Sequence, residues 1–237
     1  DAVKNSYKKN DDAAIVVFSR SCGEGADLPR NMDRFGGGKE SYLELSKEEK
    51  DLLSAVKNAG FKKTIVILHS ANPMQMDFLK QDYGINSVLW VAGTGAGDGG
   101  IRALCELLSG DSTPSGRTVD TFCYDNLSAP AMQNFGDFRY VDESGKPTGY
   151  SYVNYAEGIY VGYKYYETRY EDKVLGQGNT KDYSYVEDVC YPFGYGLSYT
   201  DFEWSNFTGK YDDKKETYTF SIHVKNVWDR PGKDVVE

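Results

Sequence analysis

The sequence has little of what metal and thiol chemistry needs. Among its 237 residues there are only two histidines and four cysteines. No two cysteines have the Cys-x-x-Cys spacing. We therefore do not expect a zinc site built from cysteine and histidine. Three of the four cysteines lie in or beside apolar runs, which favours free, buried thiols over a disulfide framework. We predict no metal and no other cofactor.

Long apolar runs and basic clusters are also absent. The longest apolar runs, residues 13–18 and 64–68, are far shorter than the roughly 18–20 residues that cross a bilayer, so no membrane partner is predicted. The 27 basic residues are outnumbered by 36 acidic ones, which gives a net charge of −9. A nucleic-acid partner is not predicted either, because duplex binding depends on clustered positive charge. The cellular compartment is left open.

What the sequence does contain is an alternation of apolar runs and amphipathic segments. Three runs have the length of strands: residues 13–18, 64–68 and 87–91. Run 13–18 is continuously apolar, which predicts a strand covered on both faces. Ser46, with Glu49 as its capping-box partner, predicts the start of a helix that ends near Gly60, and residues 101–108 predict another. The expected fold class is therefore α/β, with a largely parallel sheet flanked by helices in an α/β sandwich.

From about residue 126 the pattern changes, and tyrosine and glycine dominate. Residues 155–166 predict extended aromatic stretches interrupted at Gly158 and Gly162. Residues 217–224 alternate between apolar and polar side chains, which is typical of a half-buried strand. A β-sandwich needs about seven such strands, and we therefore interpret this end as an incomplete β-sandwich segment.

These patterns predict three parts of the chain. Residues 1–125 would form an α/β sandwich domain whose N-terminal part is missing. Residues 126–200 would complete that domain and link it to the next, and residues 201–237 would begin the β-sandwich. Functional loops in parallel sheets lie beyond the carboxyl ends of strands. The loop after residue 18 is therefore a candidate for a functional loop.

That loop contains the first candidate for chemistry. Glu24 lies between Gly23 and Gly25, and flanking glycines let a turn project one side chain without crowding. A carboxylate in this place has the chemistry of a general acid or base. The simpler alternative is a solvated loop glutamate with no role.

A second candidate is a glycine-rich loop at residues 95–100. Its sequence matches G-x-G-x-x-G, and Asp120 follows at the distance expected of a ribose-binding carboxylate, so a nucleotide-binding α/β domain is an alternative. Two observations weaken it. Asp98 would face the pyrophosphate, and the loop follows the third predicted strand, whereas the fingerprint belongs to the first. Close packing of a helix start by glycines explains the same pattern.

His69 and Ser70 end the second predicted strand. Adjacent residues on a strand point to opposite faces, so these two cannot form a Ser–His dyad. A structural histidine is the favoured interpretation.

The first loop, with the end of the strand before it, reads VVFSRSCGEGAD over residues 16–27. This block resembles the acid/base loop of glycoside hydrolase family 3, of the β-glucosidase type. Three further blocks occur in the same order: residues 93–117, which end in GDSTPSGR, residues 157–166, EGIYVGYKYY, and residues 192–200, PFGYGLSYT. Residues 224–236 are similar to the start of its fibronectin-III-like domain. One position departs from the pattern, because residue 26 is Ala where relatives often carry Tyr.

The resemblance implies a fold and an activity. Members combine a (β/α)₈ barrel, an α/β sandwich domain and often a fibronectin-III-like domain, and this chain corresponds to most of the second and the start of the third. They are retaining, exo-acting enzymes that remove terminal β-linked glucose or a related sugar without a cofactor. The barrel supplies an Asp nucleophile. By the resemblance, Glu24 is the general acid/base. Arg20, Ser21 and Asp27 are close to it in the sequence and are its expected neighbours in the cleft.

The same resemblance predicts how the chain behaves alone. A carbohydrate is the expected substrate and the barrel the expected partner, so the isolated chain should be inactive. Its exposed barrel-facing surface would favour weak self-association into a homo-oligomer. The alternative from another functional class is a noncatalytic carbohydrate-binding or structural module with the same fold.

Overall fold

The structure is a computed structural model that describes residues 2–25, 28–136 and 138–236. The chain divides into two compact units. Unit 1 comprises Asp1–Gly93 and Asp120–Phe193, and unit 2 comprises Thr94–Val119 and Gly194–Glu237. The predicted boundaries at residues 125 and 200 were placed where the expected type of structure changes. They stay a prediction.

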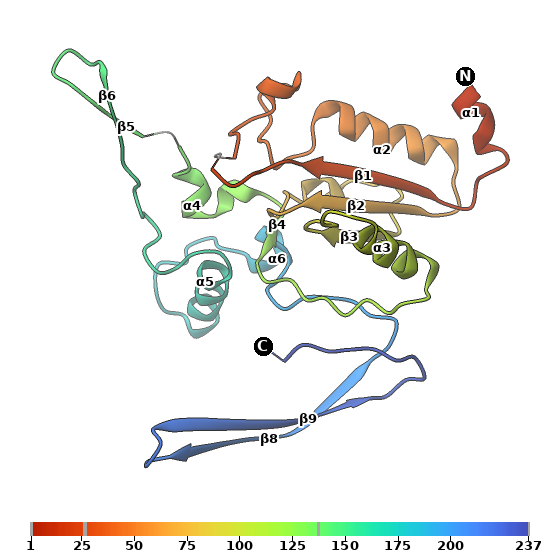
Figure 1. Cartoon of the computed structure of the whole chain (residues 1–237). Coiled ribbons are helices and arrows are strands. Elements are labelled where there is room, and N and C mark those ends of the chain that lie inside the picture. The colour runs from red at the N-terminus through yellow and green to blue at the C-terminus, as the bar shows by residue number, and fades with distance from the viewer. Residues whose placement is uncertain (1, 26–27, 137, 237) are drawn as a thin grey trace. The chain divides into compact units, whose positions relative to one another are not determined.

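Unit 1 is built on a parallel sheet. Its strands β1 (Ala14–Arg20), β2 (Thr64–Ser70) and β3 (Ser87–Val91) lie in the order β1-β2-β3 (Figure 1). Both pairs are parallel, and Arg20 lies opposite Ser70 in the register. The predicted α/β class with a parallel sheet is confirmed.

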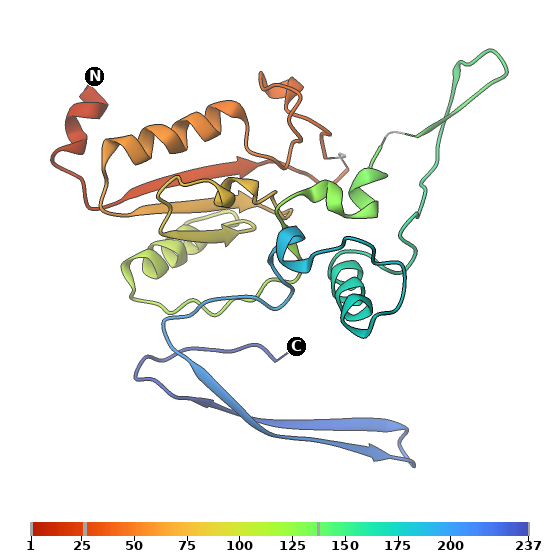
Figure 2. The same ribbon diagram turned by 180° about the vertical axis from the view of Figure 1, so that it is seen from behind.

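Helix α2 (Lys47–Ala59) connects β1 to β2 and lies alongside β1 in both views (Figures 1 and 2). It begins as predicted, because the Ser46 hydroxyl accepts from the Glu49 amide and the Ser46 amide donates to the Glu49 carboxylate. It ends at Gly60, which has a left-handed φ of 77°. The capping box thus fixes where the chain leaves the preceding loop.

The main core of unit 1 lies between α2 and the sheet. Leu53 of α2 packs with Val16 and Phe18 of β1 and with Val66 and Leu68 of β2. The prediction that β1 is covered on both faces is wrong for the described part of the chain. Ile15 and Val17, which point away from this core, are 53% and 54% exposed. Two-sided burial depends on a second covering layer, which an apolar run does not itself provide.

The remaining elements of unit 1 are short. They are α1 (Ala2–Tyr7), η1 (Asp33–Phe35), η2 (Asp77–Lys80), β4 (Phe122–Cys123), η3 (Asn126–Ser128), α4 (Pro130–Gln133), β5 (Arg139–Val141), β6 (Pro147–Ser151), α5 (Tyr163–Leu175), α6 (Tyr185–Asp188) and β7 (Val189–Tyr191). β4 pairs with β7 and β5 with β6, both antiparallel.

Helix α5 corrects the extended stretch predicted up to residue 166. Tyr163 and Tyr166 begin this helix, and Tyr166 is buried. Gly162, with φ 59°, marks the turn into the helix. Residues spaced three and four apart share one helix face, so the tyrosines carried a helical signal that their β-propensity concealed.

Unit 2 contains α3 (Gly99–Ser109) and a hairpin of β8 (Phe202–Asp212) and β9 (Thr217–Asn226). The predicted strand at residues 217–224 is confirmed. The apolar side chains in its first part, Tyr218 and Phe220, were expected to be buried but are exposed. Within the described residues the hairpin is a two-stranded sheet, and the fibronectin-III-like assignment stays a prediction.

All four cysteines are free. Cys123 is buried and Cys190 intermediate, whereas Cys22 and Cys105 are exposed. Fewer thiols are therefore buried than the sequence predicts. In the part of the chain that the structure describes, no helix is long and apolar enough to cross a membrane.

Candidate active-site loop

The candidate acid/base lies on the loop that leaves the carboxyl end of β1. Glu24 is exposed and occupies a turn, three residues after Ser21. Gly25 has a φ of 78°, a conformation that a residue with a side chain rarely adopts, and a Cβ on Gly23 would have nothing within 4 Å. Gly25 therefore permits the turn that exposes the Glu24 carboxylate, whereas the space around Gly23 would also admit a side chain. Asp27 and Ala26 lie outside the described residues.

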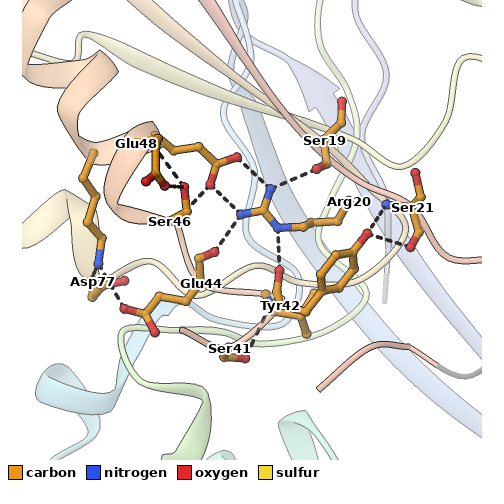
Figure 3. A network of polar contacts seen from close by, with 12 residues as sticks. Ser19, Arg20, Ser21, Ser41, Tyr42, Glu44, Ser46, Glu48 and Asp77 are labelled. Carbon is orange, nitrogen blue, oxygen red and sulfur yellow. Dashed lines mark hydrogen bonds and ion pairs between the residues drawn. The ribbon is translucent and has the colours of Figure 1, made fainter. Parts of the chain in front are cut away.

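Arg20, the last residue of β1, is 5% exposed and engages every N–H of its guanidinium group (Figure 3). Nε donates to the carbonyl of Tyr42, and Nη2 donates to the carbonyl of Glu44 at 2.6 Å. Nη1 donates to the carbonyl of its neighbour Ser19 at 2.9 Å. The remaining two donors form a bidentate pair with the carboxylate of Glu49, at 2.7 and 2.8 Å. Such planar, two-point pairing is specific to arginine.

Glu49 performs two tasks with one carboxylate. Its Oε2 accepts from Arg20 and also from the Ser46 amide at 2.8 Å. The capping box at the start of α2 is therefore joined directly to the end of β1. A buried arginine is tolerated here because its charge is paired and all of its donors are used.

Tyr42 holds the first residue after β1. Its phenol oxygen accepts from the Ser21 amide at 2.8 Å and donates to the Ser21 carbonyl at 2.9 Å. Tyr42 is 4% exposed, and the centroid of its ring lies 5.2 Å from that of Phe35. Ser21 itself is exposed and is fixed through its backbone.

Further along, the loop folds back on itself. Asn31 and Ser41 form an antiparallel bridge, and the Met32 amide donates to the Glu40 carbonyl at 3.1 Å. Tyr42 then donates its amide to the carbonyl of Arg30 at 3.3 Å. The predicted glycine-rich loop thus has internal backbone pairing.

The loop after β2 meets the same segment. The Gln75 amide donates to the Leu43 carbonyl at 2.8 Å. Lys50 of α2 forms ion pairs with Glu44 at 3.0 Å and with Asp77 at 3.1 Å. Burial disfavours the Lys50 cation, but the hydrogen bonds with Glu44 and Asp77 outweigh it and raise the pKa of Lys50 above its usual value.

His69 lies beside this region and has a partner that the sequence did not reveal. Its Nδ1 is 3.4 Å from the hydroxyl of Ser19 on β1, the residue opposite it in the register. The expectation that His69 and Ser70 form no dyad is consistent with this pairing across strands.

Of the predicted site residues, the structure places Arg20, Ser21 and Glu24 on one continuous segment. Arg20 spends its donors on Glu49 and on backbone carbonyls, so its contacts indicate that it anchors the loop. Tyr42 and Glu49 were not among the predicted site residues. The capping box did single out Glu49, but only as a local helix signal.

The rival glycine loop of unit 2 has a structural explanation. Gly95 and Gly97 have φ values of 72° and 112°. A Cβ on Gly100 would lie 2.0 Å from the Thr94 carbonyl oxygen, so the backbone itself occupies the space. Glycine is therefore required for the turn and for close approach. Among the described residues, no cluster of three His, Cys, Asp or Glu side chains could hold a metal ion.

Comparison with known proteins identifies the family. The family model described as glycosyl hydrolase family 3 C-terminal domain matches residues 1–163. The chain belongs to this family. A β-glucosidase of Ruminococcus albus is 32% identical over 239 residues, and β-glucosidase A of Butyrivibrio fibrisolvens is 32% identical over 253 residues. These alignments cover 100% and 95% of the chain but only 21% and 27% of the relatives.

Solved structures agree with this family 3 domain. β-Glucosidase 3B of Thermotoga neapolitana, solved with glycerol, has a TM-score of 0.67 and 29% identity. The similarity covers 97% of this chain and 27% of that one. A structure of the same enzyme with α-D-glucose gives a TM-score of 0.65 at 28% identity and covers 94% and 26% of the two chains. The chain thus spans roughly a quarter of the length of the proteins that it resembles.

Proposed function

We propose that this chain supplies the general acid/base to a retaining β-glucosidase, with Glu24 as that residue. The observation that carries the proposal is the place of Glu24. It is an exposed carboxylate on a glycine-flanked turn, directly after a strand of a parallel sheet, in a family 3 C-terminal domain. Loops at this edge of parallel sheets are where sites are built.

The proposed chemistry has two steps. In the first, Glu24 donates a proton to the glycosidic oxygen while a carboxylate nucleophile attacks the anomeric carbon and the leaving group departs. In the second, Glu24 removes a proton from a water molecule that displaces the sugar from the nucleophile. The two carboxyl groups would lie about 5–5.5 Å apart, as retention requires.

The nucleophile and most sugar contacts belong, in this proposal, to a (β/α)₈ barrel outside the 237 residues. The relatives support it, because they are named β-glucosidases and the match covers only 21% and 27% of their length. The substrate would be a carbohydrate with a terminal β-linked glucose or a related sugar. The enzyme would release that terminal sugar.

The test uses the full-length protein that contains this chain. Glu24→Ala should lower kcat/KM for an unactivated β-glucoside by roughly 10²–10⁴-fold, the usual contribution of general acid/base catalysis. For an aryl glucoside with a good leaving group, the rate of the first step should change little, because that leaving group departs without being protonated. Added azide should then restore turnover by attacking the glycosyl-enzyme without base assistance.

The matched control is Asp33→Ala, which removes another exposed carboxylate from the same loop. It should keep normal activity and show no response to azide. Near-normal hydrolysis of an unactivated disaccharide by Glu24→Ala would overturn the assignment. Loss of activity in both variants would instead indicate a general defect of the loop.

A further inference from the structure

We infer that Tyr42, Arg20 and Glu49 form a clamp that positions the acid/base, and this inference rests on the proposed role of Glu24. The clamp acts through the backbone of the loop and not by contact with substrate. These are therefore positioning residues in the mechanism.

The first part of the clamp holds the start of the loop. Ser21 is bound on both of its backbone polar groups by one side chain, the phenol of Tyr42. A residue held at its amide and its carbonyl can neither rotate its peptide planes nor slide along the strand without breaking a bond. Ser21 is thereby fixed although its own side chain is exposed.

The second part holds Tyr42. The carbonyl of Tyr42 accepts from Arg20 Nε, and the Glu44 carbonyl accepts from Arg20 Nη2. The returning end of the loop is thus tied to β1, and the tie is closed by Glu49, which pairs with Arg20 from the first turn of α2. Strand, loop and helix meet at one guanidinium group, as Figure 3 shows.

The consequence concerns Glu24. Only two residues, Cys22 and Gly23, separate it from the fixed Ser21, and a residue spans at most about 3.3–3.6 Å. With only two residues between them, we expect a shift of Ser21 to move Glu24 as well. Displacement of a catalytic group by about 1 Å can cost on the order of 10²-fold in rate, so the hold on Ser21 bears on the reaction.

The alternative is that the clamp merely stabilises the fold. The two roles differ in their dependence on the leaving group. A misplaced acid slows substrates that need protonation and spares those that do not, whereas partial unfolding lowers both rates together. The ratio of kcat/KM for a poor and a good leaving group is independent of how much enzyme is active, and it separates the two roles.

The experiment measures this ratio in the full-length protein with aryl β-glucosides of high and low leaving-group pKa. Tyr42→Phe removes only the hydroxyl and keeps the buried ring and the carbonyl that Arg20 binds. We expect the ratio of poor to good leaving group to fall by about tenfold or more. The control is Tyr183→Phe, which removes the hydroxyl of another buried tyrosine. That hydroxyl donates to the Tyr166 carbonyl, in a hydrophobic cluster to which Tyr42 does not belong.

Each result decides between the possibilities. A ratio that falls in Tyr42→Phe but not in Tyr183→Phe supports the clamp. An unchanged ratio in Tyr42→Phe, or an equal fall in both variants, overturns it while the role of Glu24 stands. If Glu24→Ala itself leaves the ratio unchanged, the proposed function is wrong, and this inference fails with it.

Discussion

At the residue scale, two adjacent glycines at the start of α3 have different reasons to be there. A Cβ on Gly99 would have nothing within 4 Å. A Cβ on Gly100 would lie 2.0 Å from the Thr94 carbonyl oxygen and 2.7 Å from its carbon. Both obstacles are backbone atoms, so no side-chain rotation can relieve the overlap. Only Gly100 is required by the fold.

Gly100→Ala should therefore destabilise the protein by about 1–3 kcal/mol, the usual cost of forcing an extra methyl group into occupied space. Gly99→Ala should be neutral or stabilising by up to about 1 kcal/mol, because alanine is the better helix former. Denaturant unfolding of both variants would measure this. Equal midpoints for the two variants would contradict the close approach to Thr94.

The candidate site shows how far single residues can be predicted. Glu24 could be proposed from sequence because its signal is local: an apolar run, then a carboxylate between two glycines. That pattern alone fits a solvated loop glutamate equally, and the role of Glu24 as acid/base came from the resemblance to family 3. The partners of Arg20 could not be proposed from sequence. Tyr42 and Glu49 lie 22 and 29 residues away, and the chain between them gives no periodic signal that would bring them together. The expected neighbours of Glu24 were therefore chosen by sequence proximity, whereas the start of its loop, at Ser21, is held by a residue distant in the sequence.

At the scale of elements, prediction succeeded where the signal is local. The start and end of α2 were both predicted, because a capping box and a left-handed glycine act within one turn. Helix α5 was missed because aromatic residues favour strands on average, and burial of Tyr166 in a tertiary cluster outweighed that tendency. The burial of β1 was overestimated because a second covering layer comes from elements distant in the sequence, and the apolar run itself does not show whether they are present.

Within unit 2, the carboxylate of Asp234 joins β8 to the segment that contains Arg117. The side chain of Asp234 is 5% exposed and pairs with Arg117 at 2.6 Å. The indole Nε1 of Trp204, on β8, donates to the same carboxylate at 2.7 Å. Burial disfavours the carboxylate, but the hydrogen bonds from Arg117 and Trp204 outweigh it and hold the pKa of Asp234 below its usual value.

A lowered pKa in the folded state fixes the sign of the pH dependence. The stabilisation is fully present above the unfolded pKa of about 3.9 and is lost as pH falls through the folded pKa. Asp234→Asn should lower the free energy of unfolding at pH 7 by about 1–3 kcal/mol, the usual worth of hydrogen bonds to a charged group. The difference from wild type should shrink below about pH 4.

Tryptophan fluorescence during urea unfolding at pH 7 and pH 3 would measure it, with Trp204, which contacts the carboxylate, as one of three tryptophans. The control is Asp213→Asn, which changes an exposed carboxylate in the β8–β9 turn and should have little effect at either pH. A difference between Asp234→Asn and wild type that is equal at both values of pH would exclude the ionised carboxylate as its source.

At the scale of the whole molecule, the order of elements was predictable and their grouping was not. Alternation of strand and helix predicted the parallel sheet. It did not predict that residues 94–119 form a compact unit with residues 194–237, because contacts between distant segments leave no periodic pattern. Function has the same limit. Retaining hydrolysis needs two carboxylates about 5–5.5 Å apart, and only one of them has support within this chain.

The chain alone should therefore fail to hydrolyse glycosides. Without the nucleophile and the residues that orient the sugar, the loss of positioning alone corresponds to about 10⁵-fold or more in rate. The measurement is an aryl β-glucoside assay of the purified 237-residue chain, with circular dichroism to establish that it is folded. Glu24→Gln in the same chain should give the same background rate. Turnover at an enzyme-like rate that disappears in Glu24→Gln would mean that a second carboxylate of this chain completes the site, and a separate barrel would not be needed for catalysis.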